Sequence, residues 1–204
     1  KGVLAVDVNE RQVVVGNSHV EQRIETPIDR ALRYKRLAER LQEKYSSPKY
    51  NAWLRRRGIW RRIRYFRRKA KNIMEDWARK TAHIIVSLAK QSQLAVARED
   101  LTGLVEDLRE LPKDHRTALL VLGYRRLGYW IDWQAEKNGV PLFVVDPAGT
   151  STTCPRCGAK LVEVSHRRMR CPCCGFEADR DSIAVLNIER RALSQMGGSL
   201  ATPT

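Results

Sequence analysis

Four of the five cysteines form two Cys-x-x-Cys pairs, Cys154 with Cys157 and Cys171 with Cys174. A glycine follows the second cysteine of each pair and permits the tight turn in which backbone amides point at sulfur. Four thiolates at this spacing can close a tetrahedral shell around Zn²⁺ and leave no open position, so we expect a structural zinc ribbon. Cys173 is an alternative to Cys174, although its spacing to Cys171 suits a knuckle poorly. His166 is a further alternative ligand, although an exposed position in the hairpin between the pairs suits a histidine there better.

Three acidic residues form a second set that could hold metal: Asp7, Glu99 and Asp181. The first two fall at the expected ends of strands, and Asp181 opens an apolar helix. Carboxylates that converge on a basic surface repel one another unless divalent cations lie between them. Oxygen-only ligation suits Mg²⁺ or Mn²⁺. Two such ions can activate water and stabilise the leaving 3′ oxygen in phosphodiester hydrolysis, so this set favours a metal-dependent nuclease.

Three short strands are expected at the start of the chain. Apolar runs separated by turn residues predict them at residues 2–6, 12–15 and 19–24. Tight connections between consecutive strands are typical of an antiparallel meander. Asp7 therefore falls at the end of the first strand, near the middle of the expected sheet.

Strands and helices alternate in the rest of the chain. Apolar runs at residues 94–97 and 141–145 predict two more strands, and Glu99 closely follows the first of them. Apolar residues spaced three and four apart predict helices over residues 115–136 and about 182–193. Three strands followed by helix-strand-helix-strand-helix is the element order of an RNase H-like α/β layer, in which a mixed sheet is flanked by helices.

The charge balance indicates a polyanionic partner. The chain carries 38 Lys and Arg against 23 Asp and Glu, which gives a net charge of +15 and a pI near 10.1. Nucleic acid is the commonest partner of so basic a protein. No run of about 18 apolar residues occurs, so we expect no membrane span. Clustered cysteine pairs favour a reducing compartment, and we expect a cytoplasmic protein associated with the nucleoid of a prokaryote.

The densest charge lies in a helical insertion expected at about residues 27–93. Thr26 is predicted to cap its first helix, with Pro27 at the first position. A longer helical pattern covers residues 49–90 and is divided by Gly58. It contains ten basic residues and no acidic one between the first and the last of them: Arg55, Arg56, Arg57, Arg61, Arg62, Arg64, Arg67, Arg68, Lys69 and Lys71. Like charges at this density, interleaved with aromatic residues, favour a phosphate-tracking surface over a solvated helix face.

The chain resembles the nuclease half of the TnpB family, transposon-encoded RuvC-fold proteins related to type V CRISPR effectors. The matching segments are VLAVDVNE, AREDLTGL, VVDPAGTSTTCPRCG and CPCCGFEADRDSIAVLNIERR, with the arginine-rich helix between the first two. They follow the family order over essentially the whole chain. The resemblance implies an RNA-guided DNA endonuclease that binds DNA and a guide RNA and cuts at one Mg²⁺-dependent RuvC site, with structural zinc.

Asp7, Glu99 and Asp181 match the three catalytic acids of that family. Asp179 is the alternative to Asp181, and Asp100 is the alternative to Glu99, because Arg98 stands where an apolar strand residue is usual. The N-terminal recognition parts of the family have no counterpart in this sequence, so we expect a nuclease portion.

Two other functions are open. One is a catalytically inactive nucleic-acid-binding transposition regulator that uses only the arginine-rich helix and the ribbon. The other is a structure-selective junction resolvase, against which the inserted ribbon argues. The intact set of acids argues against the inactive binder, because a pure binder gains nothing from burying three carboxylates near phosphates.

The predicted fold is of the α/β class, an RNase H-like (RuvC) mixed sheet with a long basic helical insertion and an inserted four-cysteine zinc ribbon. The nuclease core is expected over residues 1–147. The zinc ribbon follows at residues 148–178, the last core helix at residues 179–196, and a tail at residues 197–204.

Overall fold

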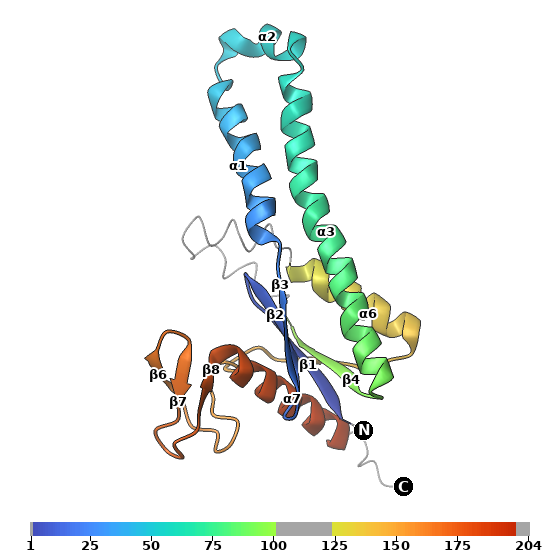
Figure 1. The fold of residues 1–204 in the computed structure, drawn as a ribbon, viewed down its shortest axis with the longest axis vertical. Coiled ribbons are helices and arrows are strands. Elements are labelled where there is room, and N and C mark those ends of the chain that lie inside the picture. The colour runs from blue at the N-terminus through green and yellow to red at the C-terminus, as the bar shows by residue number, and fades with distance from the viewer. Residues whose placement is uncertain (1, 101–123, 199–204) are drawn as a thin grey trace.

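The computed structural model describes residues 2–100 and 124–198, whose arrangement is shown in Figure 1. Residues 115–123 of the expected helix and residues 199–204 of the expected tail lie outside the described residues. The described strands form two sheets, one of five strands and one of three. None of the described helices is long and apolar enough to cross a membrane.

The larger sheet has the strand order β3-β2-β1-β4-β5 and contains both strand directions. Its strands are β1 (Val3–Val8), β2 (Gln12–Gly16), β3 (Glu21–Glu25), β4 (Ala95–Glu99) and β5 (Leu142–Val145). The first three form the antiparallel meander expected from the sequence, and β4 and β5 are parallel to β1. As a result β1 is the central strand, and its carboxyl end lies beside that of β4.

Apolar side chains cover both faces of this sheet. Leu4 and Val6 pack on one face with residues of α3 and α6, while Val3 and Ala5 pack on the other with residues of α7. The bounds of these helices are α3 (Ile59–Gln91), α6 (Tyr124–Asn138) and α7 (Arg180–Gly198). Successive residues of a strand point to opposite faces, which is why β1 is an unbroken apolar run up to its last two residues.

The helices between β3 and β4 form a long hairpin that projects away from the sheet (Figure 1). It comprises α1 (Ile28–Lys44), the 3-10 turn η1 (Pro48–Tyr50), α2 (Asn51–Arg56) and α3. Gly58 has a left-handed φ of 68° and separates α2 from α3, as the sequence predicted. The prediction that Thr26 caps α1 was wrong. Its Oγ1 donates instead to the carbonyl of Glu10 at 2.7 Å and so ties the β1–β2 turn to the start of α1.

The smaller sheet follows β5 and leads directly into α7. Its strands, in the order β6-β7-β8, are β6 (Val162–Ser165), β7 (Arg168–Arg170) and β8 (Glu177–Asp179). The buried side chains of Leu161 and Met169 pack with Ile183 of α7. Because β8 ends where α7 begins, this small sheet sets the position of the first turn of α7.

Candidate functional site

Strand register brings Asp7 and Glu99 side by side. Val6 pairs with Arg98 in the parallel β1–β4 ladder, so Asp7 and Glu99 are the next neighbours at the carboxyl ends of the two strands. Ala5 lies two residues before Asp7, and Ala97 lies two residues before Glu99. Both alanines belong to the apolar layer that packs against α7. Since side chains two residues apart share a face of a strand, Asp7 and Glu99 both point toward the α7 side.

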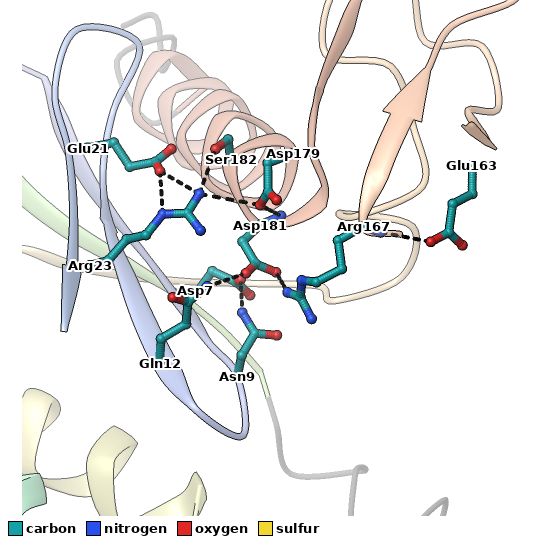
Figure 2. Close-up of polar contacts among 10 residues, drawn as sticks. All are labelled: Asp7, Asn9, Gln12, Glu21, Arg23, Glu163, Arg167, Asp179, Asp181 and Ser182. Atoms are coloured by element: carbon teal, nitrogen blue, oxygen red, sulfur yellow. Dashed lines mark hydrogen bonds and ion pairs between the residues drawn. The ribbon is translucent and has the colours of Figure 1, made fainter. Parts of the chain in front are cut away.

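Asp181 reaches the same place from the first turn of α7. Its side chain is buried and points toward Asp7, as Figure 2 shows. Gln12 of β2 donates from Nε2 to Asp181 Oδ2 at 2.8 Å. Arg167, in the turn between β6 and β7, pairs with the other carboxylate oxygen. Asp181 is therefore held by side chains from both sheets.

The environment of Asp7 disfavours its ionised form. Burial, followed by the charges of Glu99 and Asp181, raises the pKa of Asp7 to about 7. Asn9 partly offsets this by donating from Nδ2 to Asp7 Oδ2 at 2.6 Å. The negative charges of Glu99 and Asp181 thus act on the buried Asp7, and repulsion between neighbouring carboxylates is typical of a cation site.

Glu99 has one buried hydrogen-bond partner. Burial raises the pKa of Glu99 above its usual range, and the hydrogen bond from Thr150 and the charge of Arg191 partly offset that increase. Thr150 Oγ1 donates to Glu99 Oε1 at 2.5 Å. A carboxylate that accepts so short a bond from a buried hydroxyl has a restricted orientation.

The two alternative acids point elsewhere. Asp179 accepts from the backbone N–H of Asp181 at 3.0 Å and lies 3.4 Å from Arg23, so it acts as a cap of α7 (Figure 2). Asp100 is exposed. Arg98 points to the opposite face from Glu99, where it forms two hydrogen bonds with Asp132 of α6 at 2.6 and 2.8 Å.

The four paired cysteines form a compact group. The sulfur atoms of Cys154, Cys157, Cys171 and Cys174 all lie within 4.8 Å of one another. Backbone N–H groups of Cys174 and, to a smaller extent, Cys173 lower the pKa of Cys171 to about 6, which favours the thiolate form that binds metal. Cys173 and His166 are exposed and do not belong to this group.

The ten basic residues from Arg55 to Lys71 are all exposed. Four of them line a groove of about 660 Å³ beside Gly58, whose lining residues are Gly58, Arg61, Arg62, Arg64, Tyr65 and Arg68. The aromatic residues nearby are partly exposed, and the Arg57 guanidinium lies 5.6 Å from the ring centroid of Trp53. Exposed rings among exposed cations are typical of surfaces that bind nucleic acid.

Comparison with known proteins assigns the chain to a family. A family model described as the Cas12f1-like TNB domain matches residues 124–188. The TnpB-like protein MJ0751 of Methanocaldococcus jannaschii is 30% identical over 135 residues, which cover 66% of this chain and 48% of that protein. The chain belongs to the TnpB family.

Cas12f proteins are further relatives of this TnpB-family chain. The CRISPR-associated endodeoxyribonuclease Cas12f2 of a Micrarchaeota archaeon is 31% identical over 137 residues, which cover 62% of this chain and 25% of that protein. The cryo-EM structure of a Cas12f1–sgRNA–target DNA complex matches 94% of this chain and 49% of its own, with a TM-score of 0.60 at 20% identity. That likeness shows a shared mixed α/β fold. The TnpB-family chain spans less than half the length of these two curated relatives.

The structure adds four polar residues, directly or through a neighbour, to the candidate acid site that the sequence did not assign to it: Gln12, Thr150, Arg167 and Asn187. Gln12 and Arg167 bind Asp181, while Thr150 binds Glu99. Asn187 binds the backbone carbonyl of Thr150. Only Asn187 lies in a periodic pattern, and there it breaks the apolar face of a helix. A buried polar residue on such a face is the one local signal that could have indicated a partner.

Proposed function

We propose that this chain carries a Mg²⁺-dependent RuvC-type DNA endonuclease site and acts as the nuclease portion of an RNA-guided TnpB-like protein. The observation that carries the proposal is that Asp7 and Glu99 end adjacent strands, on the side of the sheet where Asp181 of α7 is buried. Burial, followed by the charges of Glu99 and Asp181, raises the pKa of Asp7 to about 7. Burial of adjacent negative charges destabilises a protein without metal, and a bound divalent cation would remove that penalty. A binder without catalytic activity would have no use for such a site.

The acid site suits a hard divalent cation. Asp7, Glu99 and Asp181 would hold Mg²⁺ or Mn²⁺, because all of the charged donors are carboxylate oxygens. When bound, these ions activate water and stabilise the leaving 3′ oxygen of a phosphodiester. Gln12 would keep the Asp181 carboxylate in place, and Arg167, which pairs with the same carboxylate, would neutralise part of its charge.

The cysteine group suits zinc in a structural role. Four thiolate donors fill a tetrahedral shell and leave no position for water or substrate. Zinc would therefore stabilise the small sheet, which we propose to be a ribbon covering residues 148–178. The core on either side of it would comprise residues 1–147, with the helical insertion at about 27–93, and residues 179–196.

The proposed partners are DNA and a guide RNA. The related Cas12f1 structure is a complex with sgRNA and target DNA. The ten exposed basic residues of the hairpin provide a surface for a phosphate backbone, and the net charge of +15 favours binding of either nucleic acid.

The central test compares Asp181→Asn with Asp179→Asn in the protein purified with RNA from its own locus. We expect Asp181→Asn to reduce Mg²⁺-dependent cleavage of labelled DNA by about 1,000-fold, equivalent to about 4 kcal/mol, because it removes a metal ligand. Asp179→Asn should retain most of the activity because Asp179 caps α7. DNA binding, measured by gel shift, should be similar in both variants.

Two results would contradict the proposal. Equal cleavage by Asp181→Asn and the unsubstituted protein would exclude the acid site as the catalytic site. Binding of DNA and RNA without cleavage by the unsubstituted protein, at any Mg²⁺ or Mn²⁺ concentration, would favour a nucleic-acid-binding regulator.

A further inference from the structure

The segment that leads from β5 into the cysteine group carries a buried hydroxyl beside Glu99. Thr150 is 4% exposed, and its Oγ1 lies 2.5 Å from Glu99 Oε1 and 3.0 Å from the carbonyl of Pro147. A hydroxyl has one proton to donate. The carboxylate is the shorter and charged contact, so it receives that proton and is oriented by it.

Asn187 holds the turn that carries this hydroxyl. Its side chain is 2% exposed, and Nδ2 donates to the carbonyls of Thr150 and Thr153, each at 2.7 Å. An amide nitrogen has two protons, and both are used on one turn. The turn cannot move along α7 without leaving buried carbonyls unpaired.

Two arginines of α7 hold the backbone on either side of that turn. Arg191 donates to the carbonyl of Asp146 and, at 2.6 Å, to that of Ala148. Arg190 donates to the carbonyl of Pro155 at 3.1 Å. Side chains of α7 therefore bind the backbone of the connecting segment both before and after the first cysteine.

The same turn runs directly into the cysteine group. Cys154 follows Thr153, and its N–H donates to the carbonyl of Ala159 at 2.8 Å to close the first knuckle. The N–H of Leu161 donates to the carbonyl of Thr152 at 2.8 Å, which joins the knuckle back to the turn. Any shift of the turn therefore moves Cys154 together with the Thr150 hydroxyl that donates to Glu99.

We propose that Thr150 and Asn187 are positioning residues that couple the cysteine group to Glu99, so that zinc binding and divalent-metal binding at the acids favour each other. This proposal rests on the proposed function because it takes Glu99 as a metal ligand. Hydrogen-bond partners of metal ligands control affinity by fixing the direction of the donor atom. Linkage requires that zinc strengthens binding at the acids by the same factor as the acid-site metal strengthens zinc binding.

A pair of variants at Thr150 tests the hydroxyl. Thr150→Val keeps the shape of the side chain without the hydroxyl, Thr150→Ser keeps the hydroxyl, and Thr152→Val makes the same change two residues away. Mn²⁺ is titrated into the zinc-loaded full chain, and free Mn²⁺ is followed by electron paramagnetic resonance. We expect Thr150→Val to weaken binding about tenfold, with Thr150→Ser and Thr152→Val within about twofold of the unsubstituted protein.

A second experiment tests the coupling through Asn187. Removal of zinc should weaken Mn²⁺ binding in the unsubstituted protein, and this difference should shrink in Asn187→Ala because the turn is no longer held. A residue that only stabilises the fold would lower the melting temperature and leave the zinc dependence unchanged. If Asn187→Ala does not fold, as judged by circular dichroism, the zinc dependence is measured in Thr150→Val, where the same reduction is expected.

Two outcomes overturn the coupling. The first is that Thr150→Val and Thr150→Ser bind Mn²⁺ with equal affinity. The second is that removal of zinc from the unsubstituted protein leaves its Mn²⁺ affinity unchanged. Asp181→Asn separates this failure from that of the proposed function. If Asp181→Asn abolishes Mn²⁺ binding and Thr150→Val leaves it intact, only the positioning role is overturned. If Asp181→Asn does not affect Mn²⁺ binding, the metal site itself is overturned.

Discussion

The two candidate metal sites of this chain are assembled in opposite ways. Cys154 and Cys174, whose sulfur atoms lie 3.6 Å apart, are separated by 20 residues. Gln12 and Asp181, which meet at the acid site, are separated by 169 residues. Loop closure costs more entropy for the longer separation, and the acids meet only when the central strands and α7 are all in place. The four cysteines all lie within one short segment, although that segment also packs on Ile183 of α7.

The two sites also differ in the ionisation of their ligand groups when no metal is bound. Backbone N–H groups lower the pKa of Cys171 to about 6, whereas the pKa of Cys157 is raised to about 12, because the lowering by the backbone N–H of Ala159 is outweighed by hydrogen bonds with neighbouring cysteines and by burial. At the acid site, burial and neighbouring charges disfavour the carboxylate of Asp7. Loss of a cysteine should destabilise the zinc-loaded protein because it removes a metal ligand, whereas loss of the Asp7 charge should stabilise the protein that lacks a cation at the acids.

The largest expected effect is that of Cys171→Ser. We expect loss of bound zinc and a fall in unfolding free energy of about 5 kcal/mol or more, because a structural zinc site contributes its binding energy to folding. Zinc content by native mass spectrometry and thermal unfolding measure the two effects. Cys173→Ser is the matched control, since Cys173 lies outside the group. Unchanged zinc content in a folded Cys171→Ser variant would refute the ribbon.

The opposite sign is expected for Asp7→Asn in zinc-loaded protein freed of Mg²⁺. The raised pKa means that the unfolded chain loses the Asp7 proton from about pH 4 upward, while the folded chain keeps it to about 7. Stability therefore falls as the pH rises through this window, by at most about 4 kcal/mol. Asp7→Asn should remove the loss and melt higher than the unsubstituted protein at pH 8, with little difference at pH 4. A lower melting temperature at pH 8 would contradict the proposed repulsion.

A moderate effect is expected away from both sites. Replacing Arg61, Arg62 and Arg64 together by alanine should weaken RNA binding about tenfold and reduce the slope of log K against log salt by about 2, because three phosphate contacts are lost. Fluorescence anisotropy at several salt concentrations measures both quantities. Zinc content and Mn²⁺ affinity should not change. An unaltered slope would make the hairpin surface a solvated helix face.

The smallest expected effect is that of Arg167→Asn. Arg167 has a left-handed φ of 61°, which asparagine also tolerates, so this substitution removes the charge without straining the turn. The guanidinium neutralises Asp181 and competes with a divalent cation for it. We expect Mn²⁺ affinity to rise about threefold, less than 1 kcal/mol, while Arg167→Lys should stay close to the unsubstituted protein. Weaker Mn²⁺ binding by Arg167→Asn would mean that Arg167 supports the cation.

Local patterns predicted most of the secondary structure. The apolar runs at residues 2–6 and 12–15 correspond to β1 and β2, and Gly58 separates two helices as expected. The prediction that Thr26 caps a helix was wrong because the Thr26 hydroxyl donates to a carbonyl in the β1–β2 turn. Helix-capping preferences take no account of such a tertiary contact. The predicted ends of the strands differ from the observed ends by one or two residues. An error of this size changes the predicted core little, but it can place a site residue on the wrong face of a strand.

Sequence spacing alone was enough to indicate the four-cysteine group, because all four ligands lie in one short segment and the turn glycines are part of the pattern. It also indicated Asp7 and Glu99 as strand-end acids. Only the tertiary structure decided that Asp181 faces Asp7 while Asp179 caps a helix, and that Thr150 and Asn187 join the cysteine group to Glu99. Such contacts depend on the register between β1 and β4 and on the position at which α7 begins after β8. No local sequence pattern encodes either of them.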